Sequence, residues 1–300
     1  MHIGLHHTGS TFIQAELLPK LKKITPITFY DSNFLNDEVL YISQCSDLYY
    51  DNSYEKKVKD LLKDKKNIFI SSEAFSGVRY GVYTSGYTNK FVAERLKNIF
   101  KNPKILIGIR NQKSMIKCLY KGAVQMGYLG DFEHFFKENL KNCQLDIFKY
   151  YNFIKFYMDF FGKDNVFVYL HENFFNKNKT KELLVHMGID PDGIEDVDFN
   201  RRFNSSYLPL TQKITFFINR FFGSKLSYGV SFGRDPRLRF YNLWRYTLSK
   251  YVDRFSNAVG YKDTELDFKG YDKILNDQFH QDNLKLSKLL GSNLHDHGYI

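Results

Sequence analysis

The sequence predicts an α/β fold: a three-layer sandwich with a mostly parallel central sheet and helices on both sides. Compact apolar runs at 67–71, 104–109 and 165–170 have the length and composition of strands that are buried on both faces. Each run stops at a polar or charged residue, and helical patterns follow. Alternation of strand and helix along a chain is typical of a parallel sheet.

The composition indicates a folded protein with a preference for anionic partners. Because the 300 residues show no composition shift and no low-complexity linker, we expect one domain over 1–300, with a mainly helical C-terminal part from about residue 200. A hydrophobic content of 43% is that of a folded chain. The formal net charge of +10 favours a nucleotide, an acidic polysaccharide, nucleic acid or an anionic membrane surface as partner.

The cysteines and the apolar segments indicate a compartment. Cys45, Cys118 and Cys143 are odd in number and lack CxxC or metal-type spacing, which is typical of a reducing environment. The first apolar run begins almost at Met1 without the pattern of a signal peptide. No apolar stretch reaches the length of about 18 residues that a membrane span needs. We therefore expect a soluble, cytoplasmic protein.

The first element is a strand, a phosphate loop and a helix. Residues 1–14 read MHIGLHHTGSTFIQ, an apolar start followed by the frame Gly4-x-x-His7-Thr8-Gly9-Ser10-Thr11 and a helical pattern. Glycines let the backbone turn with its N–H groups inward, and the helix that starts near Ser10 adds the positive end of its dipole. This geometry suits a phosphate or sulfate group.

Further elements follow from periodicity and from the residues that break it. Proline at position 19 is expected to interrupt the first helix, and the Gly-, Tyr- and Ser-rich segment 77–89 is expected to form a loop over the site. Basic residues gather around Trp244 near the C-terminal part. We expect a short strand within 24–30, helices at 55–62, 90–100, 115–124 and 179–187, and two helices within 132–161.

A nucleoside triphosphate loop is the rival interpretation of the first turn. Gly4 and Gly9 match the glycines of G-x-x-x-x-G-K-[ST], but Ser10 stands where the lysine is required. The missing lysine disfavours triphosphate hydrolysis. A strand-to-helix turn without a ligand is the remaining structural alternative.

The order of several motifs resembles a known family. Three segments are similar to bacterial sulfotransferases that use 3'-phosphoadenosine-5'-phosphosulfate (PAPS): HIGLHHTGST at the start, ISSEAFSG at the end of the run 67–71 and IRNQKSMIKCLY at the end of the run 104–109. FVYLHENFFNKNKTKELLVHMG at 167–188 and FHQDNLKLSKLLGSNLHDHGY at 279–299 extend the likeness over nearly the whole chain. The resemblance implies the P-loop NTPase-like sulfotransferase fold.

The resemblance also implies a reaction and its partners. A sulfuryl group would pass from PAPS to a hydroxyl or amine, leaving adenosine 3',5'-bisphosphate (PAP). The implied acceptor is a carbohydrate or another small molecule, with no nucleic acid partner, and the oligomeric state stays open. Neither a metal nor a covalent nucleophile is required. No metal is expected from the sequence either, because His2, His6, His295 and His297 lack acidic or cysteine partners at ligand spacing.

The resemblance assigns the donor's phosphosulfate to the first turn. His7 departs from the family pattern, which has lysine at this position. Adjacent phosphate charge favours imidazolium, so our hypothesis is that His7 supplies the positive charge and a proton in place of lysine. An impaired or repurposed enzyme is the competing interpretation. The loop residues assigned to the donor are His6, His7, Thr8, Gly9, Ser10 and Thr11.

The remaining site residues also follow from the resemblance. Arg110 is expected to hold the 3'-phosphate together with the residue eight positions on, where this chain has Cys118 instead of serine. A thiol is a weaker donor than a hydroxyl, so discrimination should be weaker. Glu73 is the candidate general base, with His171 in reserve, and both could instead have structural roles. The other functions left open are a P-loop phosphotransferase and a non-catalytic nucleotide or polyanion binder.

Overall fold

The structure is a computed structural model with helices predominating in a mixed α/β chain. It divides into two compact units: Met1–Gln112, Cys143–Phe203 and Lys273–Ile300 form the first, and Lys113–Asn142 with Asn204–Asp272 form the second. The expectation of a single domain stays a prediction. The residues that the structure describes are 1–31, 36–65, 67–76, 89–201, 208–222, 243–260, 266–268 and 270–300.

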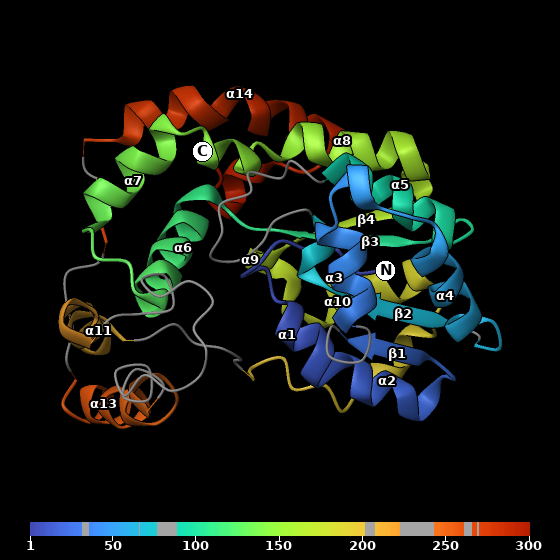
Figure 1. The fold of residues 1–300 in the computed structure, drawn as a ribbon, viewed down its shortest axis with the longest axis horizontal. Coiled ribbons are helices and arrows are strands. Elements are labelled where there is room, and N and C mark those ends of the chain that lie inside the picture. The colour runs from blue at the N-terminus through green and yellow to red at the C-terminus, as the bar shows by residue number, and fades with distance from the viewer. Residues whose placement is uncertain are drawn as a thin grey trace. The chain divides into compact units, whose positions relative to one another are not determined.

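Parallel strands organise the first unit. Strand β1 (Thr28–Asp31) pairs in parallel with β2 (Ile68–Ser71), and β3 (Ile105–Ile109) pairs in parallel with β4 (Val166–Leu170). The central segment (residues 1–5) lies between the two pairs, because His2 forms parallel bridges to both Ser71 and Leu106. Across the unit the order is therefore β1, β2, central segment, β3, β4 (Figure 1).

Backbone hydrogen bonds hold the central segment on both sides. The N–H of His2 donates to the carbonyl of Ile70 at 2.8 Å, and the N–H of Ile3 donates to the carbonyl of Leu106 at 2.9 Å. All five residues of β3 are buried. Because side chains alternate between the faces of a strand, both faces of β3 are covered by other parts of the chain. The predicted α/β class with parallel strands is thus confirmed.

The helices lie close to the predicted positions. The predicted segments correspond to α4 (Ser53–Leu62), α5 (Asn89–Ile99), α6 (Gln112–Met126), α7 (Phe132–Lys141), α8 (Tyr150–Phe161) and α10 (Lys177–Met187). The other helices are α3 (Asn36–Gln44), α9 (His171–Phe174), α11 (Pro209–Phe222), α13 (Ser249–Ala258) and α14 (Asp272–Leu290). Short 3₁₀ turns are Asp47–Tyr49, Glu73–Ser76, Gln144–Phe148, Lys163–Asn165, Pro191–Ile194 and Leu294–His297.

The helix after the first loop continues through its proline, contrary to expectation. It comprises α1 (Ser10–Phe12), a π turn (Ile13–Leu17) and α2 (Leu18–Ile24). In the widened turn the N–H of Leu18 donates to the carbonyl of Ile13. A π turn loosens the helical ladder where a proline would otherwise collide with it, so the helix passes Pro19 without a break.

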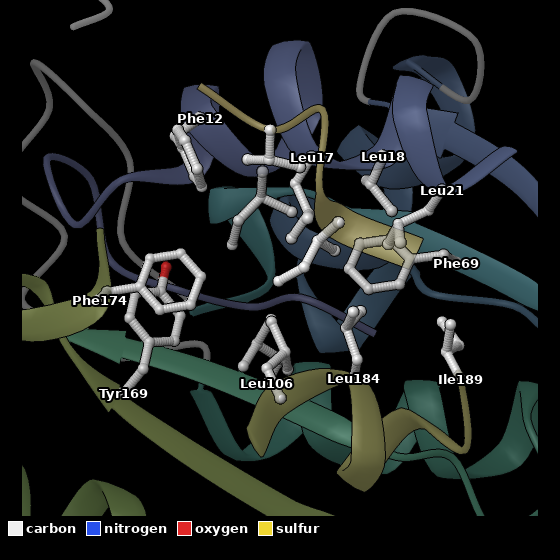
Figure 2. Close-up of a cluster of buried hydrophobic side chains, with 14 residues drawn as sticks. Phe12, Leu17, Leu18, Leu21, Phe69, Leu106, Tyr169, Phe174, Leu184 and Ile189 are labelled. Atoms are coloured by element: carbon white, nitrogen blue, oxygen red, sulfur yellow. The ribbon is translucent and has the colours of Figure 1, made fainter. Parts of the chain in front are cut away.

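A hydrophobic core attaches this helix to the strands. Figure 2 shows Phe12, Leu17 and Leu21 of the helix facing the strand residues Phe69 and Leu106. Burial of one such side chain contributes about 1.5–3 kcal/mol. The helix that follows the first loop is therefore fixed by packing. Other members of the cluster are Ile13, Leu18, Tyr169, Phe174, Leu183, Leu184, Ile189, Ile194 and Val197.

The second unit is helical over its described residues. Tyr120, Ala123 and Val124 of α6 form a buried cluster with Phe135 of α7, and Phe216 of α11 packs against it. Arg234, Arg237, Arg239 and the loop residues 77–88 lie outside the described residues, as does the side chain of Arg245. Among the helices that the structure describes, none combines the length and the apolar composition needed to cross a bilayer.

Glycine 108 should be indispensable for the packing of the strands. A Cβ there would lie 2.4 Å from Cζ of Tyr169 and 2.7 Å from Oγ1 of Thr8. We expect Gly108→Ala to lower the free energy of unfolding, measured by urea denaturation, by about 1–3 kcal/mol. A Tyr169→Leu background removes the clashing ring atoms, so the same substitution should cost less there. Strict additivity of the two changes would contradict the proposed contact.

Candidate anion-binding site

The first loop turns sharply between the central segment and α1. His7 and Gly9 have positive φ angles of 65° and 104°, in the left-handed region. Gly9 is the N-cap of α1, and its carbonyl accepts the N–H groups of Phe12 and Ile13. A strand, a turn of left-handed residues and a helix N-terminus thus follow one another directly. Backbone N–H groups at such a turn form an anion-binding concavity.

Close contacts explain both glycines of the loop. A Cβ on Gly9 would lie 2.9 Å from Cζ of Phe175, and one on Gly4 would lie 2.6 Å from Nε2 of His2. Both positions therefore need glycine for space, and Gly9 needs it for its φ angle as well. Thr8 is fully buried, and its hydroxyl donates to the carbonyl of Leu5 at 2.6 Å. This hydrogen bond closes the loop, so the proton of the Thr8 hydroxyl is directed inward.

Ser10 places a hydroxyl in a different environment. It is the first residue of α1 and is 4% exposed. Its Oγ has no hydrogen-bond partner among the described residues. A buried polar atom without a partner costs about 1–3 kcal/mol. The oxygen of an anion bound at the helix N-terminus would satisfy it, so the residues present fit a phosphate or sulfate group.

The connectivity of the strands puts this loop at a switch point. From the central segment the chain runs to β1 and β2 on one side, and later to β3 and β4 on the other. At the carboxyl edge of the strands, the loop after the central segment therefore leads toward β1 and the loop after β3 leads toward β4, in opposite directions. In open parallel sheets, ligands bind at the carboxyl ends of the strands at such a point.

Arg110 follows β3 and reaches the first loop. Its Nη1 donates to the carbonyl of His7 at 3.2 Å, and its own carbonyl accepts the hydroxyl of Tyr150 at 2.7 Å. The permanently charged guanidinium thus lies against the loop that would hold an anion. Cys118 is half-buried on the part of α6 that belongs to the second unit. The expected pairing of Arg110 with Cys118 on one phosphate stays a prediction.

The charge of Arg110 helps to lower the pKa of two histidines. Burial first, and then the charges of His6 and Arg110, lower the pKa of His7 to about 4. Burial, Arg110 and His7 lower the pKa of His171, the residue that follows β4, to about 3. Both imidazoles are therefore neutral at pH 7, and Arg110 carries the positive charge. A bound anion would raise both pKa values, so its binding should be accompanied by proton uptake.

Glu73 lies at the same edge, two residues after β2. It begins the 3₁₀ turn Glu73–Ser76 and is half-buried, and the Ser76 hydroxyl donates to its carbonyl at 2.7 Å. The hydroxyl of Tyr169 has a raised pKa, mainly through burial, and the charge of Glu73 contributes to the rise. His6 and Thr11 are half-buried within the loop and the first turn of the helix.

The structure adds Glu172 to the residues predicted from sequence. One carboxylate oxygen accepts the N–H and the side-chain amide of Asn111 at 2.9 and 2.8 Å, and the other accepts the Tyr299 hydroxyl at 3.3 Å. Glu172 therefore fixes the turn that carries Arg110. The sequence offered one indication that Glu172 matters, which is its position next to His171 at the end of a strand. Its partners are 61 and 127 residues away along the chain.

His2 is another residue whose role the sequence did not reveal. It is fully buried, with Nδ1 2.8 Å from the Ser71 hydroxyl and Nε2 3.1 Å from the Tyr169 hydroxyl. It therefore connects the strands on either side of the central segment. Within the described ranges, no three or more His, Cys, Asp or Glu side chains come together as a metal site would require.

Comparison with protein-family models, with curated proteins and with solved structures finds no match to this chain. The geometry of the first loop and of the strand ends is therefore what bears on function.

The buried histidines should make stability depend on pH. In the unfolded chain the His7 imidazole takes up a proton near pH 6.5, whereas in the folded protein it does so only near pH 4. The stability that neutral His7 contributes is therefore complete above pH 6.5 and is lost as the pH falls toward 4. We expect His7→Gln to reduce the loss of unfolding free energy between pH 7.5 and 4.5 by on the order of 2 kcal/mol, measured by urea denaturation. The exposed His134→Gln serves as control. The same pH dependence in His7→Gln as in wild type would refute this account.

Proposed function

We propose that this protein is a PAPS-dependent sulfotransferase that acts in the cytoplasm on a hydroxyl or amine of a carbohydrate acceptor. The observation that carries the proposal is the first loop, where a left-handed turn precedes a helix whose first residue, Ser10, holds a buried hydroxyl without a hydrogen-bond partner among the described residues. The motif order that resembles the sulfotransferase family supports the same assignment.

The strand arrangement supports the finer fold assignment. A phosphate-type loop after the central segment, with parallel strands on both sides, is compatible with a three-layer P-loop sulfotransferase fold. When bound, PAPS supplies an activated sulfuryl group and leaves as PAP. In the proposal, the loop N–H groups and the Ser10 hydroxyl hold the phosphosulfate, while Arg110 contributes permanent positive charge and contacts the 3'-phosphate.

Proton transfer is assigned to the side chains at the strand ends. His7, neutral in the free site, would become imidazolium beside the anion and stabilise charge on the departing oxygen. Glu73 is the proposed base that accepts the acceptor's proton. His171 stays in reserve for this role, because burial and the charges of Arg110 and His7 lower its pKa to about 3 in the free site.

One observation favours a second candidate, a non-catalytic nucleotide or polyanion binder. Burial keeps His7 neutral where the family has a lysine, so the loop of the free protein lacks the cation expected beside the bridging oxygen. Such a protein would bind the nucleotide without transferring a group. A P-loop phosphotransferase is less well supported, because Ser10 replaces the lysine that triphosphate chemistry uses.

Donor recognition is tested by calorimetric titration with PAP and with ADP. We expect PAP to bind at least about tenfold more tightly, because only PAP offers a 3'-phosphate to Arg110. Arg110→Gln should weaken PAP binding by about 10- to 100-fold and reduce the preference. Lys155→Gln, which removes an exposed cation paired with Asp159, is the control and should bind as wild type does. Equal affinities of wild type for PAP and ADP would remove the main support for the donor assignment.

Catalysis is tested by PAP release from PAPS in the presence of sugar and amino-sugar acceptors. We expect His7→Ala to lower the transfer rate by about 100-fold or more, and His7→Lys to retain transfer. His134→Ala serves as control for the loss of an exposed imidazole. Undiminished transfer by His7→Ala would exclude the proposed role of His7. Tight PAP binding by a wild-type protein that transfers nothing would instead favour the non-catalytic binder.

A further inference from the structure

Hydrogen bonds and burial fix successive residues of the turn that carries Arg110. The carbonyl of Arg110 accepts the hydroxyl of Tyr150 at 2.7 Å. The N–H and the side-chain amide of Asn111 donate to one oxygen of the Glu172 carboxylate at 2.9 and 2.8 Å. The next residue, Gln112, begins α6 and is fully buried. Because each residue of the turn is constrained, the side chain of Arg110 extends from a fixed backbone.

A second part of the chain reaches the same carboxylate. The 3₁₀ turn Leu294–His297 ends at Gly298, whose φ angle of 79° lies in the left-handed region that glycine adopts readily. Tyr299 follows and is 2% exposed. Its hydroxyl donates to the second oxygen of the Glu172 carboxylate at 3.3 Å. Glu172 therefore links the Arg110 turn to a distant part of the chain.

Asn283 of α14 forms another connection to the same turn. It is 4% exposed, and its side-chain amide exchanges hydrogen bonds with that of Gln112 at 2.9 and 3.3 Å. The same side chain donates to the carbonyl of Ile300 at 2.8 Å. The residue after Tyr299 is thus anchored through Asn283 to the residue that begins α6. All of these residues belong to the first unit.

A carboxylate is an unexpected neighbour for a candidate anion site, because its negative charge repels a bound anion. The donors that Glu172 holds explain its presence, since hydrogen bonds to a charged acceptor are roughly twice as strong as those between neutral groups. Burial first, and then the charge of Glu172, raise the pKa of the Tyr150 and Tyr299 hydroxyls. Both hydroxyls therefore stay protonated and act as donors.

We propose that Glu172 and Tyr299 are positioning residues, which act through Arg110 by holding its guanidinium where it can contact the anion at the first loop. In the free site Nη1 of Arg110 already donates to the carbonyl of His7 at 3.2 Å. A guanidinium held in this way loses less conformational freedom when the anion binds, and the affinity is higher for that reason. The inference rests on the proposed function for the identity of the anion, a PAPS-type nucleotide.

The test is calorimetric titration of the whole protein with PAP, with ADP and with inorganic sulfate. We expect Glu172→Ala to weaken PAP binding by about 5- to 20-fold and Tyr299→Phe by about 2- to 5-fold, because the Arg110 turn is less well held. Glu172→Gln keeps an oxygen that accepts from Asn111, so it should retain most of the affinity. If Glu172 acted by its charge alone, both Glu172 variants would bind more tightly than wild type.

The Arg110→Gln background separates positioning from a general loss of structure. There, Glu172→Ala and Tyr299→Phe should each change the PAP affinity by less than about twofold, because the group through which they act is gone. The matched control is Tyr50→Phe, which removes a hydrogen bond of 3.1 Å from a tyrosine to Glu55 elsewhere in the first unit and should bind as wild type does. Circular dichroism establishes that each variant is folded. Tyr299→Phe removes a single oxygen, so it keeps the test decisive if Glu172→Ala does not fold.

The outcomes separate this inference from the proposed function. Wild-type affinity in both Glu172→Ala and Tyr299→Phe, or losses equally large in the Arg110→Gln background, would overturn the inference and leave the donor assignment intact. Equal binding of PAP and ADP by wild type, with losses in these variants and in Arg110→Gln, would remove the donor assignment and support the inference. A wild type that binds none of the three ligands would overturn both.

Discussion

The first unit depends on a close approach of backbone and side chains around Gly4 and Gly108. Nothing larger than hydrogen fits at either glycine, because His2, Thr8 and Tyr169 fill the adjoining space. His2 contacts the hydroxyl of Ser71 in the neighbouring strand β2, and the Tyr169 hydroxyl contacts His2. The Thr8 hydroxyl donates to the carbonyl of Leu5 and so holds the loop. The position of the loop is thereby fixed by the same contacts that bring the strands together.

The electrostatics of the site follow from that packing. A loop held this tightly buries His7, and burial is what lowers its pKa most. The resulting site combines one permanent cation, Arg110, with neutral imidazoles that can become charged when an anion arrives. If such a site binds an anion, as proposed, the affinity would depend on the proton concentration, because the imidazoles gain charge only when the anion is present.

Local patterns predicted the buried strands and several helices but not α3, while long-range contacts determined what the sequence could not reveal. Apolar runs located the strands β2, β3 and β4, because strands buried on both faces leave a continuous signal. The break expected at Pro19 was wrong, since a π turn is not visible in periodicity. Glu172 was overlooked because its partners lie far away in the chain.

The central segment has a consequence for the order in which the protein assembles. It comes first in the chain, yet its hydrogen-bond partners are Ile70 on one side and Leu106 on the other. Synthesis must pass residue 106 before the segment can be paired on both sides, so its edge towards β3 stays unpaired while the intervening residues are made. The first loop, which follows the central segment, cannot take its final shape sooner. A nascent chain that ends before β3 would therefore contain the complete sequence of the first loop, while the edge of the central segment that pairs with Leu106 would still be exposed.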